Sequence, residues 1–122
     1  AKKHHDSLVE EWSLITWADG RLWNASSLYM RDRAKSDEAL AESEEAYQSL
    51  IGSSSSDIIG RANYGLARIL EMKGELEAAS EQYGKVTGMF AEIAKERAEY
   101  LKGSQAKKSY AWITKVEAAP TE

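Results

Sequence analysis

One short motif matches the sequence pattern of a known type of catalytic centre. Ser104 and Lys107 match the S-x-x-K pattern, in which a lysine one helical turn away helps to activate a serine nucleophile. The companion motifs S-D-N and K-T-G are absent from the sequence, and no β-sheet that could form the surrounding pocket is predicted. A helix N-cap serine followed by a solvated lysine accounts for both residues. We therefore expect no acyl-enzyme chemistry at this motif.

Other residue types that support catalysis or metal binding are sparse. His4 and His5 are adjacent, so they do not share a helix face as two ligands four residues apart would. Glu44 and Glu45 also point apart, whereas a glycosidase needs two carboxyl groups that face each other across a cleft. The absence of cysteine excludes disulfides, thiolate nucleophiles and cysteine-ligated metals. We predict a protein that is not an enzyme and that has no metal site and no cofactor.

A stripe of charged and aromatic residues between positions 61 and 71 has the chemistry of a binding surface. Positions i, i+3, i+7 and i+10 follow one face of a helix. Two guanidinium groups beside a tyrosine suit an extended peptide or a carboxylate, because guanidinium donates paired hydrogen bonds and the ring offers apolar area. The alternative is a solvated face on which Arg68 forms an ion pair with Glu71 or Glu75. The stripe consists of Arg61, Tyr64, Arg68 and Glu71.

Tryptophans on the first predicted helix offer a second candidate surface. Trp12 belongs to the apolar stripe of this helix and is predicted to lie in the core. Trp17 and Trp23 lie off that stripe, so the helix is apolar on more than one face. Either the helix packs against two neighbours, or these two rings form an exposed patch for a partner or for a second copy of the chain. The apolar stripe consists of Leu8, Trp12, Ile15, Ala18, Leu22, Ala25 and Tyr29.

The elements that position these residues are all predicted to be helices. The only proline is Pro120, and Ala, Glu, Leu and Lys are abundant. Ser7 and Glu10 form a capping box, so the first helix is expected to begin near Ser7. Either Ser36 or Asp37 is expected to cap the second helix. Six helices are predicted over about residues 7–30, 37–51, 57–73, 75–87, 89–102 and 104–116, with turns at Gly74, Gly88 and Gly103 and a loop at 52–57.

Length and charge restrict the domain organisation and the partners. A chain of 122 residues is expected to form one domain, here over residues 7–117, with disordered ends at 1–6 and 118–122. The net charge of −4, with an acidic block in residues 36–60, argues against a nucleic-acid partner. No stretch approaches the roughly 20 apolar residues that cross a bilayer, so we expect no direct membrane contact by this chain.

Residues 62–86 combine small, large and turn-forming residues in a regular order. This order resembles a tetratricopeptide repeat, although Asn63 stands where the first aromatic is usual and the closing proline is missing. A degenerate unit, from Trp17 to Leu50, precedes it. The resemblance implies an all-α fold of about six helices in stacked antiparallel hairpins, which form a right-handed superhelix. The matching positions are Ala62, Leu66, Ala67, Leu70, Gly74, Leu76, Ala79, Tyr83 and Val86.

A narrower resemblance appears near the end of the chain. The sequence "AKKSYAWI" at 106–113 is similar to the closing segment of repeat domains in planctomycete-type membrane-anchored proteins. The segments "AYQSL" at 46–50 and "YGLAR" at 64–68 fit the same family. This resemblance implies a bacterial interaction domain in an extracytoplasmic or periplasmic location, tethered by a membrane helix outside the present sequence. A cytoplasmic location is the alternative.

Two functions follow as hypotheses. The first is a non-catalytic scaffold or adaptor module that binds another protein or a peptide through Arg61, Tyr64, Arg68 and Glu71, with Trp17 and Trp23 as further contacts. The second is a structural self-association domain, a homodimer in which the tryptophans of the first helix are buried against a second copy. The mass of the chain in solution as a function of concentration distinguishes the two.

Overall fold

The computed structural model describes residues 2–103 and 105–109, and it describes side chains from Leu8 onward. Over this part of the chain all regular secondary structure is helical, which confirms the predicted all-α class. A short helical segment at 105–109 follows the last long helix. The elements are α1 (Lys2–Leu28), α2 (Arg33–Leu50), α3 (Ser56–Met72), α4 (Leu76–Tyr83), the 3₁₀ helix η1 (Gly88–Phe90) and α5 (Ala91–Leu101).

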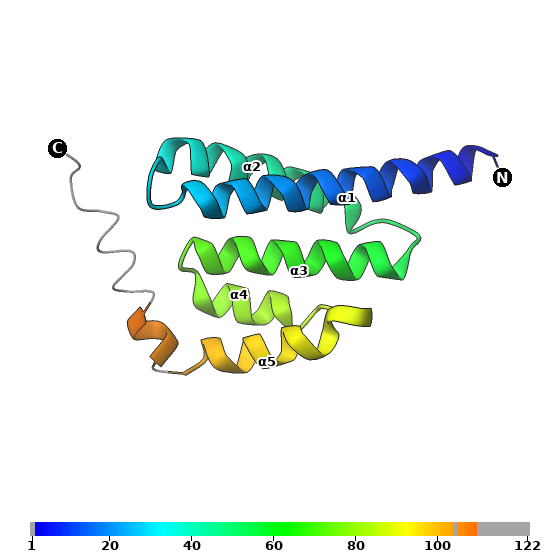
Figure 1. Cartoon of the computed structure of the whole chain (residues 1–122). Helices are drawn as coiled ribbons and strands as arrows, with labels where there is room; N and C mark the ends of the chain where they lie inside the picture. The colour runs from blue at the N-terminus through cyan, green and yellow to red at the C-terminus, as the bar shows by residue number, and fades with distance from the viewer. Residues whose placement is uncertain (1, 104, 110–122) are drawn as a thin grey trace.

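Consecutive helices run in opposite directions and lie side by side (Figure 1). The α1–α2 hairpin forms one end of the stack, and α4 and α5 form the other. Helix α3 lies between these two groups and contacts α1, α2, α4 and η1. The first turns of α1 extend beyond the ends of its neighbours. Helix α3 is therefore the element that connects the two halves of the molecule.

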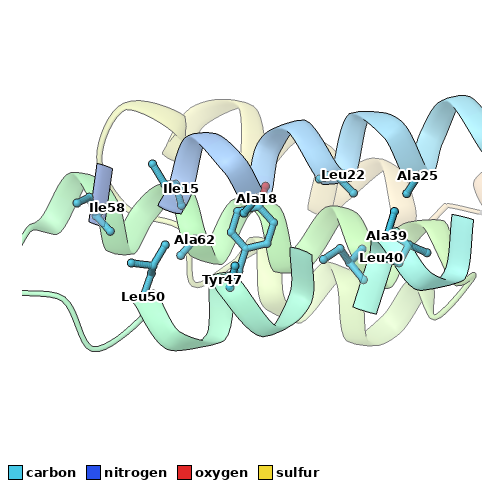
Figure 2. Close-up of a cluster of buried hydrophobic side chains, with 12 residues drawn as sticks. Ile15, Ala18, Leu22, Ala25, Ala39, Leu40, Tyr47, Leu50, Ile58 and Ala62 are labelled. Carbon is cyan, nitrogen blue, oxygen red and sulfur yellow. The ribbon is translucent and has the colours of Figure 1, made fainter. Parts of the chain in front are cut away.

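Two groups of buried side chains form the core, one on each side of α3. The first group joins α1, α2 and α3, and in it Ile15, Tyr47 and Ile58 are fully buried (Figure 2). The second group joins α3, α4 and α5, and it includes Ala106 from the segment after α5. The predicted inward residues of the second, third and fourth helices lie in these groups, namely Leu40, Ala46, Tyr47, Leu50, Ala62, Ala67, Ala79, Tyr83 and Val86.

Two predicted helix starts are wrong. Helix α1 begins at Lys2 and not at the capping box of Ser7, so residues 2–6, which were expected to be disordered, are helical. Helix α2 is capped by Asp32, whose carboxylate accepts a hydrogen bond from the backbone N–H of Lys35. Ser36 is buried inside the helix, where its hydroxyl donates to the carbonyl of Ala25 at 2.8 Å. A side chain that could cap a helix is here used to join two helices.

The turn between α3 and α4 is as predicted, but α4 is shorter than predicted. Gly74 has a φ of 81°, a left-handed conformation that glycine adopts without steric cost. Helix α4 ends at Tyr83 and not near residue 87, because the chain tightens into turns in which Lys85 and Val86 donate to carbonyls three residues back. These turns place Val86 in the core. The chain then passes through η1 before α5 begins at Ala91.

The prediction that Trp12 lies in the core is also wrong. The inward line of α1 is occupied by Ile15, Ala18 and Leu22, and Trp12 lies at its edge with an exposed ring. Ser104 and the predicted continuation of the sixth helix over 110–116 lie outside the described residues, as does the tail at 118–122.

Candidate functional site

A cluster of three polar side chains, the first cluster, connects α1, α2 and α3. Tyr47 of α2 donates its hydroxyl hydrogen to Oδ1 of Asp19 on α1. Arg61 of α3 donates to Oδ2 of the same carboxylate and forms an ion pair with it. The Arg61 guanidinium also lies over the ring of Trp12, 5.4 Å from the ring centroid. Each carboxylate oxygen of Asp19 therefore has a partner from a different helix.

A second cluster repeats this arrangement between α3, α4 and α5. Tyr83 of α4 donates its hydroxyl hydrogen to Oε1 of Glu71 on α3, at 2.8 Å. Nε of Arg97, on α5, lies 3.0 Å from both carboxylate oxygens of Glu71, and its Nη2 contacts Oε2. The Arg97 guanidinium lies over the ring of Tyr100, 4.9 Å from the centroid. In both clusters a tyrosine and an arginine thus share one carboxylate.

The two clustered tyrosines are strongly held in the protonated state. Burial raises the pKa of Tyr47 well above its ordinary value, and the hydrogen bond to Asp19 raises it further. Burial likewise raises the pKa of Tyr83, as does the negative charge of Glu71. Both hydroxyls therefore remain hydrogen-bond donors at neutral pH.

Sequence analysis missed the clusters, although the sequence contains a signal for them. Tyr47 and Arg61 are 14 residues apart, and so are Tyr83 and Arg97. The second pair follows the first by 36 residues, which is close to the length of one helical-hairpin repeat. A comparison of the chain with itself at this period would have paired the tyrosines and the arginines of the two clusters, but not their carboxylates, since Asp19 and Glu71 are 52 residues apart. Among the residues that recur at this period are Leu40 and Leu76, Tyr47 and Tyr83, Arg61 and Arg97, Ala62 and Ala98, and Tyr64 and Tyr100.

Three of the four residues of the predicted stripe serve packing within the chain. Arg61 belongs to the first cluster and Glu71 to the second. Tyr64 packs against two aromatic rings, with its centroid 5.1 Å from that of Phe90 and 5.7 Å from that of Tyr83. The alternative ion pair between Arg68 and Glu71 is not formed, because Glu71 binds Arg97 instead.

Arg68 differs from the other stripe residues because it is exposed. Within the described part of the chain, no hydrogen bond or ion pair involves its guanidinium. It lies seven residues after Arg61, on the same face of α3 and about 10.5 Å further along the helix axis. Its charge acts on Tyr47, where it partly opposes the rise in pKa. Arg68 is thus a cation on this face that is available to an external anion.

A small cavity lies at the N-terminal end of α3, on the same face. Its volume is about 150 Å³, which is comparable to the apolar cavities in proteins that hold a benzene ring. Phe90 forms part of its wall and is held in place by stacking on Tyr64. The side chain of Met89 is largely exposed at its rim. The residues that line the cavity are Trp12, Asp57, Arg61, Thr87, Met89 and Phe90.

Trp17 and Trp23 do not join the α3 stripe. Helix α1 packs against both α2 and α3, as one of the two alternatives predicted, but the rings of Trp17 and Trp23 take no part in this packing and are exposed. Trp17 borders a cavity of about 270 Å³ on the α2 side, which is also lined by Glu42, Glu45 and Ser49. These tryptophans therefore belong to a surface of their own.

Two carboxylates of the described residues are engaged within the chain. Asp19 and Glu71 both accept hydrogen bonds from an arginine and a tyrosine of the same chain. Among the described residues, no group of three His, Asp or Glu side chains could hold a metal ion. In the same residues, no helix is long and apolar enough to cross a membrane.

No family model, curated protein sequence or solved structure matches this chain. The candidate surfaces of this chain are the α3 face with its cavity and the exposed side of α1.

Proposed function

We propose that this chain is a non-catalytic protein–protein interaction module of tetratricopeptide type, which binds an extended peptide segment of another protein along α3. The observation that carries the proposal is the state of the arginines on this face. Arg61 and Arg97 are each neutralised by a carboxylate of the chain, whereas Arg68 is exposed and has no such partner. An exposed guanidinium held between two ordered clusters supports recognition of a carboxylate.

The cavity and Arg68 together define the peptide that would bind. The cavity beside Phe90 accepts one bulky apolar side chain. Arg68, which lies about 10 Å further along the axis of α3 than Arg61 of the cavity wall, binds a carboxylate. An extended chain advances about 3.3 Å per residue, so the two groups of the peptide are about three residues apart. The proposed ligand is therefore a segment with an aromatic or large aliphatic residue and, three residues away, an acidic side chain or the C-terminal carboxylate.

The roles of the other predicted residues follow from their contacts. Arg61 and Tyr64 shape the cavity, and Glu71 orients Arg97 rather than binding the peptide. Because only a short stack of helices forms this face, we expect modest affinity for a peptide. We include in the proposal the extracytoplasmic, membrane-tethered placement that the sequence resemblance implies.

Selection from a random peptide library displayed on phage tests this function. We expect enriched sequences with an apolar and an acidic position separated by two residues. Fluorescence anisotropy with labelled synthetic peptides would then compare the wild type with Arg68→Glu, for which we expect a loss of affinity of about tenfold or more.

The matched control is Lys85→Glu, which makes the same change of charge at an exposed position after α4. We expect it to change the affinity by no more than about twofold, and both variants should retain the helical circular dichroism of the wild type. Equal binding of selected peptides by wild type and Arg68→Glu would refute the proposal, as would a selection without any enriched sequence.

A further inference from the structure

The exposed surface of α1 is unusual because it is almost free of charge. Between Val9 and Ser27, eleven residues are exposed, and Glu10 is the only charged residue among them. Three further charged residues of this stretch, Glu11, Asp19 and Arg21, are half-buried and are engaged by side chains of the rest of the chain. On α2, by contrast, eight residues are exposed and four of them are charged. The solvent-facing side of a helix is normally rich in charged residues. The outer face of α1 therefore has the composition of a surface that another helix covers.

Large apolar side chains lie on this face. The exposed fractions of Trp12, Trp17 and Trp23 are 38%, 46% and 70%, and that of Val9 is 53%. Contiguous exposed apolar surface of this kind marks an interaction site. The three rings together expose roughly 400 Å², at about 250 Å² for one whole tryptophan.

A strip of small residues, Thr16 and Gly20, separates the tryptophans, and we call this strip the channel. Trp12 and Trp23 are eleven residues apart, which is close to three helical turns, so both lie on the edge of α1 near α3. Trp17 lies on the opposite edge, beside α2. Between the edges are Thr16 and Gly20, and a Cβ atom added to Gly20 would meet nothing within 4 Å. A second helix can therefore approach α1 closely along this channel.

The spacing of the rings is self-complementary. Trp17 lies five residues after Trp12 and six residues before Trp23, close to the midpoint between them. If two α1 helices pack antiparallel about a two-fold axis at this midpoint, Trp12 of one copy lies beside Trp23 of the other. Trp17 then lies beside its own counterpart, because a two-fold axis pairs each edge of the helix with the same edge of the second copy. Aromatic pairs of this kind favour association.

We propose that the uncharged face of α1 is the interface through which two copies of this chain form an antiparallel dimer. A nearly uncharged face pairs with itself without electrostatic repulsion, whereas the acidic surface of α2 would repel its own copy. Stable interfaces bury about 800 Å² from each partner, and the three rings supply about half of that. We therefore expect a dimer that dissociates on dilution. This inference goes beyond the proposed peptide site, with which the interface shares Trp12, and it does not depend on Arg68.

The first test is analytical ultracentrifugation of the whole chain over a hundredfold range of concentration. The wild type should shift from the mass of one chain to that of two. Gly20→Lys should remain a monomer, because it places a charge in the centre of the channel, and the open space around Gly20 allows the helix to stay folded. The matched control is Gly52→Lys, at a loop glycine with equally open surroundings, which should dimerise as the wild type does. A wild type that stays monomeric would overturn the proposal, as would dimerisation of Gly20→Lys.

Single cysteines test the antiparallel arrangement, since the chain contains none of its own. The two copies of residue 16 would lie about 4.5 Å apart along the helix axis, and those of residue 27 roughly 28 Å apart. Oxidation should therefore link Thr16→Cys into a covalent dimer and leave Ser27→Cys, which is equally outward-facing, unlinked. Linking of both variants would indicate a parallel dimer, and linking of neither would indicate a different surface; both results contradict the proposal. Arg68→Glu should dimerise normally, which separates this test from that of peptide binding.

Discussion

The first and second clusters contain the same three kinds of residue, but they differ in burial. The side chain of Asp19 in the first cluster is 44% exposed, whereas that of Glu71 in the second is 8% exposed. Arg61 reaches one oxygen of its carboxylate, and Arg97 contacts both oxygens of Glu71. The same polar pattern thus holds a partly hydrated carboxylate between α1 and α3 and a nearly dry carboxylate between α3 and α5, whereas the arginine is more exposed in the second cluster (40%) than in the first (29%).

The corresponding tyrosines Tyr64 and Tyr100 show a related difference. They are 36 residues apart, like the members of the clusters. Tyr64 is covered by Phe90 of the following 3₁₀ helix, whereas Tyr100 is 43% exposed. A position in a helical stack is completed by the element that follows it, so equivalent residues are buried to different extents in the middle of the stack and near its end.

Removal of the two carboxylates is the strongest test of the first comparison. We expect Glu71→Ala to lower the free energy of unfolding by about 3 kcal/mol, because it leaves the Tyr83 hydroxyl buried without an acceptor and Arg97 without its counter-charge. Asp19→Ala removes the same contacts at a hydrated site, and we expect a loss of about 1 kcal/mol. Urea unfolding followed by circular dichroism measures both values. Equal losses would show that burial does not distinguish the clusters.

The second test concerns the surface beneath the Tyr47 ring. Gly65 lies against this ring, and a Cβ atom at that position would overlap ring carbons. We expect Gly65→Ala to lower the free energy of unfolding by about 2 kcal/mol, because the tyrosine must move and weaken its bond to Asp19. The equivalent position beside the second cluster, 36 residues later, is the buried Leu101, so the two tyrosines do not have the same surroundings.

The control for this substitution is Gly20→Ala. Gly20 lies within α1, and its surroundings are open. Alanine has the higher helix propensity, so the same change should raise the free energy of unfolding by up to about 1 kcal/mol. If Gly65→Ala also stabilised the protein, Tyr47 would not be packed against α3 as observed.

Much of the fold could be predicted from local sequence patterns. The spacing of Ala62, Leu66, Ala67 and Leu70, with a glycine at 74, indicates a helix, its inward face and its end without reference to the rest of the chain. The helix starts were harder to predict, because capping is a competition between neighbouring polar residues. Asp32 caps α2, and Ser36, which was expected to be a possible cap, lies inside the helix and donates a bond to α1.

The candidate site was only partly predictable, because its ion pairs join distant residues. One alternative predicted from the sequence paired Arg68 with Glu71 or Glu75, since such pairs can be evaluated from sequence separation. The actual partner of Glu71, Arg97, lies 26 residues away on another helix. This pairing depends on how the two hairpins stack, which cannot be derived from the spacing of residues along one helix. The same limit applies to Trp12, whose position at the edge of the core depends on where α3 crosses α1.

Alkaline titration is the test with the smallest expected effect. It tests whether the tyrosines of the two clusters contribute equally to stability at high pH. Burial raises the pKa of Tyr47 and of Tyr83, so the folded protein holds both protons at a pH at which the unfolded chain releases them. Stability from these groups is complete below the unfolded pKa of about 10 and is lost as the pH rises above it. Each tyrosine should contribute a loss on the order of 1 kcal/mol between pH 10 and pH 11.

Urea unfolding at pH 8 and pH 11 measures this loss in the wild type, Tyr47→Phe and Tyr83→Phe. Phenylalanine has no proton to release, so each variant should lose less stability than the wild type over this interval, and by a similar amount. Groups that titrate in all three proteins cancel in the comparison. A smaller effect at Tyr47 than at Tyr83 would mean that the hydration of Asp19 extends to the tyrosine hydroxyl. The first cluster would then be open to water at its tyrosine as well as at its carboxylate.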